Sequence, residues 1–270
     1  MILGMNLRNL TDEEMNNVVW RYMPFSKFIS LLTYQALWFS KLNHLDDGLE
    51  GKIPSVTKKR MHQEHQVHKL TFNNPEFHRQ IDNWNDENEE SGRELIIANC
   101  WFIGNSESEK MWKEYASLEE GVAIKSTPKL LTENVLMIQD DHITHIGCLE
   151  YVEHTNHEMT SYEGNQAIER AFIKDKEYED EKELRLATMN WKTRYCVRPD
   201  GVQYTDEEVQ GAGMNNFENP GLYIGTKIDH LFTEVVVSPN ASDYFYNLVK
   251  RLIDLYGIKA NVVRSSLTST

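Results

Sequence analysis

The stretch from Phe172 to Leu186, FIKDKEYEDEKELRL, determines how we interpret the rest of the chain. Its first part is crowded with charged residues, and its end alternates charged with apolar residues. This order predicts a charged turn that enters a strand. Because side chains alternate between the two faces of a strand, we expect Glu181, Glu183 and Arg185 to project together. Two carboxylates beside a guanidinium are typical of a binding pocket, but they are also typical of a solvated strand edge.

The composition is that of an ordinary globular protein, with 40% hydrophobic and 26% charged residues in a chain of 270 residues. A chain of this length can bury a large core, and we predict a single domain over residues 1–270. The net charge of −14 opposes a broad basic surface that could hold a nucleic-acid duplex. Nucleic acid is therefore not the partner that the composition favours, although a local basic groove would be compatible with it.

The cysteines and the N-terminal sequence bear on the cellular compartment. Cys100, Cys148 and Cys196 form no CxxC pair, and their odd number does not suggest a disulfide framework. The first residues, MILGMNLRNLTDEE, lack the basic segment and the apolar core of a signal peptide. No apolar run reaches about 18 residues, the length of a membrane span. These features predict a cytoplasmic protein with reduced cysteines and no membrane partner.

Apolar periodicity predicts an α+β fold with a curved, mainly antiparallel sheet flanked by helices. No GxGxxG or GxxxxGKS motif is present, so the sequence favours neither a Rossmann nor a P-loop fold. Strands are predicted at residues 18–23, 36–40, 95–103, 121–126, 145–152, 222–225, 235–237 and 260–263. Helices are predicted at residues 26–32, 106–117, 129–131, 167–174 and 242–256.

Residues 55–92 have a polar, helical composition, which we interpret as a helical insertion within the domain. This segment contains His62, His65 and His68. Residues three apart drift by about 60° around a helix, so the outer two histidines should diverge, and no HExxH motif is present. The remaining clustered histidines also match no metal template: His142, His145, His154 and His157. We therefore expect no metal site.

Several short motifs follow one another in a fixed order along the chain. The most distinctive are Met111-Trp112-Lys113-Glu114-Tyr115-Ala116, Gly121-Val122-Ala123-Ile124 and Glu181-Lys182-Glu183-Leu184-Arg185-Leu186. The others are Arg21-Tyr22, Trp38-Phe39-Ser40, Asp47-Gly48-Leu49-Glu50-Gly51, Cys100-Trp101-Phe102 and Val237-Ser238-Pro239. Together they resemble the bacterial domain-of-unknown-function family 2971 over nearly the whole chain. That family usually has proline where this chain has Gly48, so we expect a looser turn here. The family name implies no reaction.

The chain also resembles ADP-ribosyltransferases in outline. In that family an arginine on the first strand grips a dinucleotide phosphate, and a Ser-Thr pair on a middle strand supports the nicotinamide side. The second glutamate of a Glu-x-Glu motif stabilises the ribosyl oxocarbenium ion. The resemblance places Arg21, Ser126-Thr127 and Glu181-x-Glu183 at these positions, although Pro128 replaces the last serine of the full Ser-Thr-Ser pattern. It implies that NAD is a candidate substrate and that no cofactor is required.

These patterns give a set of candidate site residues, whose side chains we expect to line one cleft. The candidate catalytic residues are Glu183, Glu181 and Arg21. The candidate substrate-binding residues are Tyr22, Ser40, Asp47, Glu50, Trp112, Tyr115 and Arg185. Trp112 and Tyr115 could stack on a base, but large aromatic residues of a helix more often belong to the core. Arg185 could instead form a salt bridge that fixes Glu181 or Glu183.

Three classes of function are compatible with these residues. The first is an enzyme that acts on an N-glycosidic bond of a nucleotide, either ADP-ribosyltransferase-like or NAD-cleaving, because a fixed carboxylate stabilises the charge of a breaking glycosidic bond. The second is a nucleic-acid base glycosylase in antiviral defence, for which Lys58, Lys59 and Arg60 could begin a basic groove. The third is a non-catalytic sensor or interaction module whose charges are solvated surface. A small-molecule nucleotide is the partner we expect, and the sequence leaves the oligomeric state open.

Overall fold

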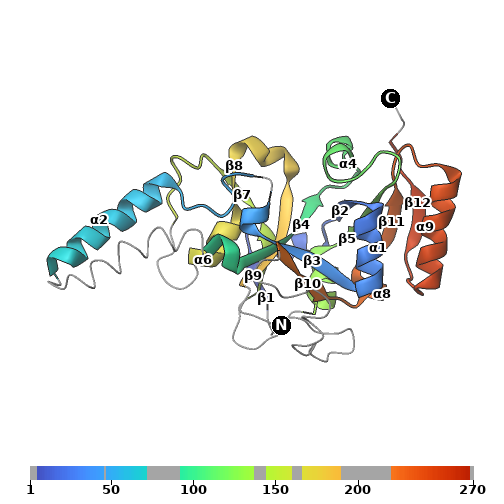
Figure 1. Ribbon diagram of the computed structural model, residues 1–270, viewed down its shortest axis with the longest axis horizontal. Helices are drawn as coiled ribbons and strands as arrows, with labels where there is room; N and C mark the ends of the chain where they lie inside the picture. Colours follow the sequence, from blue (N-terminus) through green and yellow to red (C-terminus); the bar gives the residue numbers. More distant parts are fainter. Residues whose placement is uncertain are drawn as a thin grey trace.

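The structure is a computed structural model, and it describes residues 5–45, 47–71, 92–136, 144–159, 166–189 and 220–267. Its centre is a ten-stranded sheet in which most neighbouring strands are antiparallel. The strand pairs β1–β6 and β11–β12 are parallel. Helices lie beside the sheet and at its ends, as Figure 1 shows. The predicted α+β class with a mainly antiparallel sheet is confirmed.

The strands of the large sheet run in the order β1-β6-β9-β4-β2-β5-β11-β12, and β10 and β3 branch from β4. Their bounds are β1 Met5–Arg8, β2 Val19–Pro24, β3 Ala36–Lys41, β4 Ile96–Ile103, β5 Gly121–Ser126, β6 Thr144–Cys148, β9 Glu183–Met189, β10 Gly221–Gly225, β11 Glu234–Val237 and β12 Asn261–Arg264. A second sheet pairs β7, Glu150–Val152, with β8, Ile173–Asp175.

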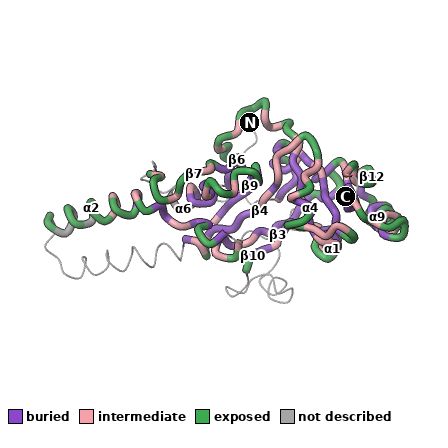
Figure 2. Tube along the Cα trace, turned by 90° about the horizontal axis from the view of Figure 1, so that it is seen from above, coloured by how far each residue is buried: buried purple, intermediate pink, exposed green. Residues whose placement is uncertain are grey.

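The α-helices are α1 Phe25–Tyr34, α2 Ser55–Thr71, α4 Glu109–Tyr115, α5 Pro128–Asn134, α6 Gln166–Glu169, α8 Ile228–Leu231 and α9 Asp243–Leu255. The described residues also form four short 3-10 helices: η1 Glu14–Asn16, η2 Leu42–His44, η3 Arg170–Phe172 and η4 Lys176–Glu181. Helices α1 and α9 bury apolar side chains in the main core, among them Phe28, Leu32, Phe245 and Val249. In Figure 2 the buried residues follow the central strands, whereas α2 extends away from them and is mostly exposed.

The large sheet divides along one edge of β4. At one end of this edge Trp20 of β2 pairs with Phe102, and at the other end Ser40 of β3 pairs with Ala98. The opposite edge of β4 pairs continuously with β9. Between Ala98 and Phe102 the sheet therefore opens, and side chains of β2, β3 and β4 can converge on this opening.

The side chains of β9 alternate between an apolar core on one face of the sheet and a charged cavity on the other. Leu184 and Leu186 are fully buried in the main core, as their alternation with charged residues predicts. Glu183 and Arg185 lie on the other face and line a cavity. Glu181 was expected on the same strand, but it ends η4 instead. Lys182, with a φ of 41°, turns the backbone sharply before β9 begins, so Glu181 reaches the cavity from a 3-10 turn.

Two other local predictions differ from the structure. The predicted strand 145–152 is two strands in different sheets, β6 and β7, and the predicted helix 167–174 is α6, η3 and β8. These are short apolar segments, in which helical and extended periodicity are hard to distinguish. Strand β1 and helix α8 were not predicted from the sequence.

The predicted insertion at residues 55–92 is described only in part. Its first half forms α2, whose start is anchored where Thr57 Oγ1 accepts a hydrogen bond from the backbone of Met159 at 2.8 Å. Figure 1 shows the rest of α2 projecting from the body of the protein. Residues 72–91 and 190–219, His142 and the side chains of His65 and His68 lie outside the described part. The single-domain assignment stays a prediction.

Candidate active site

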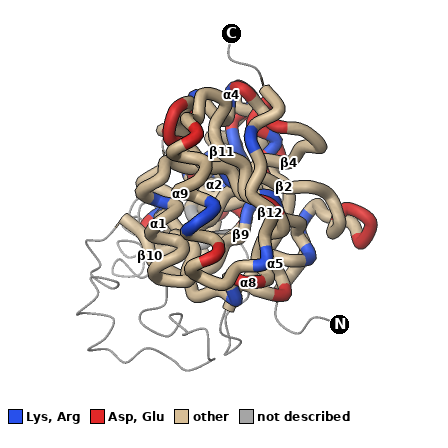
Figure 3. Tube along the Cα trace, turned by 90° about the vertical axis from the view of Figure 1, so that its right-hand side faces the viewer, with Lys and Arg blue, Asp and Glu red and all other residues tan. Residues whose placement is uncertain are grey.

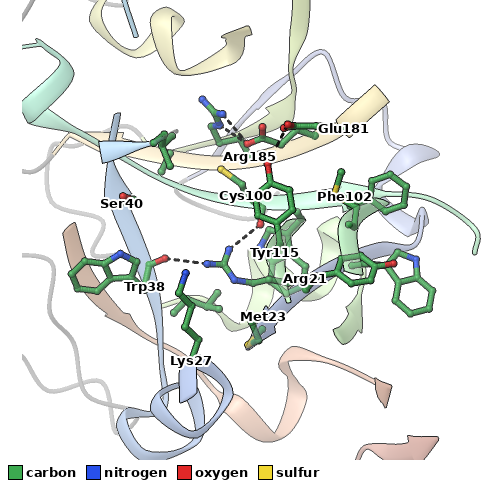
Figure 4. Close-up of a pocket in the computed structure, with 18 of the residues that line it drawn as sticks. Arg21, Met23, Lys27, Trp38, Ser40, Cys100, Phe102, Tyr115, Glu181 and Arg185 are labelled. Atoms are coloured by element: carbon green, nitrogen blue, oxygen red, sulfur yellow. Dashed lines mark hydrogen bonds and ion pairs between the residues drawn. The ribbon is translucent and has the colours of Figure 1, made fainter. Parts of the chain in front are cut away.

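A cavity of about 550 Å³ lies where the sheet divides, and its size suits a small-molecule ligand. Figure 4 shows side chains entering it from strands β2, β3, β4 and β9 and from helices α1 and α4. All but one of the sequence-predicted site residues line it: Arg21, Tyr22, Ser40, Asp47, Glu50, Tyr115, Glu181, Glu183 and Arg185. Residues that are remote in sequence thus share one cavity.

Trp112 is the exception, because it belongs to the core. Its side chain is fully buried, and its ring packs edge-on against Tyr22 with centroids 5.0 Å apart. Its Nε1 donates a hydrogen bond to Glu107 Oε2 at 2.9 Å. Other aromatic side chains do line the cavity, among them Trp38 of β3 and Tyr223 of β10, with ring centroids 4.9 Å apart. For Trp112 the structure therefore agrees with the alternative that a large aromatic residue of a helix belongs to the core.

Ser126 and Thr127 also lie outside the cavity lining. Ser126 is buried and donates a hydrogen bond from Oγ to the carbonyl of Leu231 at 2.6 Å. Thr127 caps α5, because its Oγ1 accepts a hydrogen bond from the backbone of Leu130 at 3.2 Å. Both residues thus hold the fold together, and this part of the ADP-ribosyltransferase outline is not reproduced.

One end of the cavity holds the two carboxylates of the Glu-x-Glu motif around a lysine. Lys174 Nζ lies 2.6 Å from Glu181 Oε2 and 3.4 Å from Glu183 Oε2. The exposed fraction is below one tenth for all three side chains. Tyr115 donates a hydrogen bond from its hydroxyl to Glu181 Oε1 at 3.1 Å. The lysine therefore offsets the repulsion between two carboxylates that face the same space.

Arg185 holds two glutamates at this end of the cavity in place. It is fully buried and donates hydrogen bonds to Glu183 Oε1 at 2.8 Å, to Glu50 Oε1 at 2.6 Å and to the carbonyl of Ala171 at 2.8 Å. These bonds agree with the alternative that Arg185 fixes a glutamate by a salt bridge. Its guanidinium orients the glutamates, and most of its donors are already engaged.

Glu183 and Glu50 differ in pKa because their neighbours differ. Burial raises the pKa of Glu183, but the charges of Arg185 and Lys174 outweigh burial and hold that pKa below its ordinary value. Burial raises the pKa of Glu50 above its ordinary value, and Arg185 only partly offsets it. Of these two glutamates, Glu183 is therefore ionised, and Glu50 takes up a proton more readily.

Cys100 is a thiol rather than a thiolate in this environment. Burial, followed by the charge of Glu183, raises its pKa to about 12. The thiol shares a hydrogen bond with Glu183, which helps to keep that carboxylate ionised. Since the thiolate is the nucleophilic form of cysteine, Cys100 is unsuited to attack a substrate at neutral pH.

The carboxylates of Asp47 and Glu50 have acceptor atoms to spare. Asp47 Oδ1 accepts a hydrogen bond from the backbone of Leu49 at 2.8 Å, which closes the loop around Gly48. Asp47 Oδ2 and Glu50 Oε2 are buried and have no hydrogen-bond partner among the described residues. Unpaired buried acceptors are costly, so these two atoms are able to accept hydrogen bonds from a ligand.

Arg21 occupies the opening between β2 and β3. Its Nη1 donates a hydrogen bond to the carbonyl of Cys100 at 2.8 Å, and its Nη2 donates one to the carbonyl of Trp38 at 3.5 Å. The guanidinium lies 6.0 Å from the centre of the Trp101 ring. No ion pair joins it to a carboxylate anywhere in the described ranges. Arg21 thus satisfies backbone groups that the divided sheet leaves unpaired, and it keeps N–H donors for a ligand.

Tyr22 and Ser40 line the cavity with their polar groups engaged. The backbone of Ser108 donates a hydrogen bond to the Tyr22 hydroxyl at 2.9 Å, and Ser40 Oγ donates one to the carbonyl of Pro220 at 3.4 Å. Both residues therefore shape the wall as it stands, whereas Tyr115, 42% exposed, reaches toward Glu181 from the open side.

Several residues that line the cavity were not among the candidates from the sequence: Lys27, Trp38, Cys100, Lys174, Tyr178 and Tyr223. Lys174 lies in the stretch from Phe172 to Leu186, but the sequence pattern placed it at the end of a helix. In the structure it lies on β8, from which its ammonium group reaches Glu181 and Glu183. Trp38 was noted only as part of a motif, and its alternation with Leu37 and Phe39, both buried, was the available signal.

No group of three His, Cys, Asp or Glu side chains is placed to hold a metal ion among the residues that the structure covers. Over the same residues, no helix combines the length and the apolar character needed to cross a membrane. A scan against protein-family models and a search of curated proteins find no match for this chain. The resemblance to domain-of-unknown-function family 2971 and to ADP-ribosyltransferases therefore stays a prediction.

Proposed function

We propose that the cavity binds a nucleotide and that the protein cleaves an N-glycosidic bond of it, by hydrolysis or by transfer to an acceptor. The observation that carries this proposal is the convergence of Arg21, Glu181 and Glu183 on one cavity. A cation and two carboxylates at different parts of one cavity match a substrate that carries a phosphate and also develops positive charge.

In this proposal the electron pair of the breaking bond leaves with the base, and positive charge appears at the anomeric carbon of the sugar. Glu183 stabilises that charge, because Arg185 and Lys174 keep its carboxylate ionised and hold it in place. Water or an acceptor hydroxyl then adds to the same carbon, and a carboxylate takes its proton. Glu181, 8% exposed and hydrogen-bonded to Tyr115, is the carboxylate placed for that second role.

The structure favours a small nucleotide over a nucleic acid as substrate. Lys58, Lys59 and Arg60 lie on α2, away from the cavity lining, and Arg60 pairs with Glu158 at 2.6 Å. On the face seen in Figure 3, basic and acidic residues are interspersed over the described part of the chain. Such a surface lacks the clustered positive charge by which proteins hold a duplex.

A product assay tests the proposal. The purified protein is incubated with NAD and with a panel of nucleotides, and free nicotinamide or free base is measured by chromatography. We expect release from at least one nucleotide, and we expect it to decrease in a Glu181→Gln variant that still binds the nucleotide. Binding without any release would instead support a non-catalytic sensor.

A further inference from the structure

Two cations stand in the part of the cavity beside Trp38. Arg21 comes from β2 and Lys27 from the first turn of α1. Lys27 is exposed, and in Figure 4 its ammonium end and the guanidinium of Arg21 are directed toward the space beside Trp38. Two positive side chains thus enter one part of the cavity from different elements.

Neither cation has a close carboxylate partner among the described residues. Across the described ranges, no ion pair joins Lys27 or Arg21 to a carboxylate. The chain nevertheless carries 42 acidic against 28 basic residues, and the cations at the other end, Lys174 and Arg185, are paired with glutamates. Like charges that share a space without a counterion repel each other, so an anion bound between them would be stabilised.

The walls around these cations suit a nucleotide rather than a simple anion. Trp38 and Tyr223 contact each other edge-on beside them, and Ser30 of α1 holds the Tyr223 hydroxyl at 2.7 Å. Aromatic faces next to cations can pack on a base or a sugar while the cations take phosphate oxygens. The cavity volume of about 550 Å³ is in the range of ligand sites for molecules of this size.

We propose that Lys27 and Arg21 form an anion subsite that takes the phosphates of a nucleoside diphosphate group, with Trp38 and Tyr223 as its aromatic wall. This inference rests on the proposed function and deepens it by naming the substrate class. The phosphates lie at the Lys27 end, and the glycosidic bond faces Glu181 and Glu183 at the other. Lys27 is a substrate-binding residue that selects phosphorylated nucleotides over nucleosides.

Calorimetric titration of ADP and of adenosine tests the subsite without any need for turnover. The wild-type protein should bind ADP at least about tenfold more tightly than adenosine, because charge-assisted hydrogen bonds to phosphate are among the stronger ones. Lys27→Met should weaken ADP binding about tenfold and leave adenosine binding unchanged. The matched control is Lys250→Met, since Lys250 is also an exposed helical lysine but lies on α9, outside the cavity lining.

The outcomes separate the subsite from the proposed reaction. Equal binding of ADP and adenosine by the wild type, no binding of ADP, or equal ADP affinity in Lys27→Met and Lys250→Met would each overturn the subsite. Thermal unfolding of each variant shows that it is folded, and Lys27→Arg, which keeps the charge, should retain most of the ADP affinity. Lys27-dependent ADP binding in a protein that releases no base would establish the subsite and refute the reaction.

Discussion

The ammonium group of Lys174 lies 2.6 Å from Glu181 Oε2 in a contact that is almost closed to solvent. The same ammonium group is 3.4 Å from Glu183 Oε2, so it is shared by the two carboxylates. Burial opposes its charge, but Glu183 and Glu50 outweigh burial and raise the pKa of Lys174 above its ordinary value. The lysine therefore stays charged between the two carboxylates.

Lys174→Met should lower the free energy of unfolding by about 3 kcal/mol, since removal of one partner leaves buried carboxylates without their cation. Urea unfolding at neutral pH measures this change. Lys125→Met is the control, because Lys125 and Glu234 form a more exposed ion pair at 3.5 Å and should contribute less than about 1 kcal/mol. Adding Glu181→Gln to Lys174→Met should restore part of the loss. A double variant no more stable than Lys174→Met would show that the pair is not coupled.

Glu50 gives a prediction about pH. Burial raises its pKa above the ordinary value of 4.5, so the folded state binds this proton more tightly than the unfolded state does. The corresponding stability is present below pH 4.5 and is lost as pH rises through the raised pKa. Glu50→Gln removes this titration. Its free energy of unfolding relative to wild type should therefore increase as pH rises from 4 toward 7, and a relative decrease would mean that Arg185 dominates.

Trp38 and Trp112 should respond in opposite ways to substitution. Trp38→Ala should weaken nucleotide binding by about 1 to 3 kcal/mol, the usual contribution of a base stacked on an aromatic ring. Trp112→Phe should instead lower stability by about 1 to 3 kcal/mol, through lost packing and the lost hydrogen bond to Glu107. Titration calorimetry and thermal unfolding of both variants make the comparison. Weakened nucleotide binding in a folded Trp112→Phe protein would contradict the assignment.

Chelators should leave the release of base unchanged. The reason is ligand geometry: in the part of the chain that the structure describes, no three potential ligands are placed around one point. Activity is compared before and after dialysis against EDTA, and the metal content of the purified protein is measured by mass spectrometry. Stoichiometric zinc together with activity that EDTA removes would contradict this expectation.

Sequence patterns predicted strongly periodic helices and strands better than they predicted how the strands pair in the sheet. The strand at 121–126 and the helix that Ser242 caps have local signals, and the structure places both within a residue or two of their predicted bounds. The division of the sheet at β4 depends on pairing between remote segments, so no local pattern reports it. The cavity lies at this division and is lined by Trp38, whereas Trp112 is buried in the core.

Part of the candidate site was predicted because several of its charged residues lie in short, distinctive motifs. Arg21, Glu50 and Glu183 could be selected as residue types suited to one chemistry, and they line the same cavity. Lys174 and Lys27 could not, since a lysine at a surface element is common and its direction depends on tertiary packing. The two lysines nevertheless each bring a positive charge to the cavity.

A shorter carboxylate at position 183 distinguishes the effect of its charge on stability from the effect of its position on the reaction. Glu183→Asp keeps the negative charge beside Arg185 and Lys174, so its stability should stay within about 1 to 2 kcal/mol of wild type. The carboxylate is withdrawn by one methylene, and base release should fall by at least about tenfold. The two quantities are measured on one preparation. An unchanged rate would mean that the position of the carboxylate does not matter for the reaction.

The most direct test of the account is the rate of base release by Glu183→Gln, measured with nucleotide affinity at a temperature where the variant is folded. The amide keeps the shape of the side chain but loses the charge that would stabilise the oxocarbenium ion. It also leaves Arg185 and Lys174 with one carboxylate fewer, so some loss of stability is expected. We predict that kcat falls by about 100-fold or more while Kd for the nucleotide changes less than about threefold. A folded variant that releases base at the wild-type rate would contradict the role of Glu183.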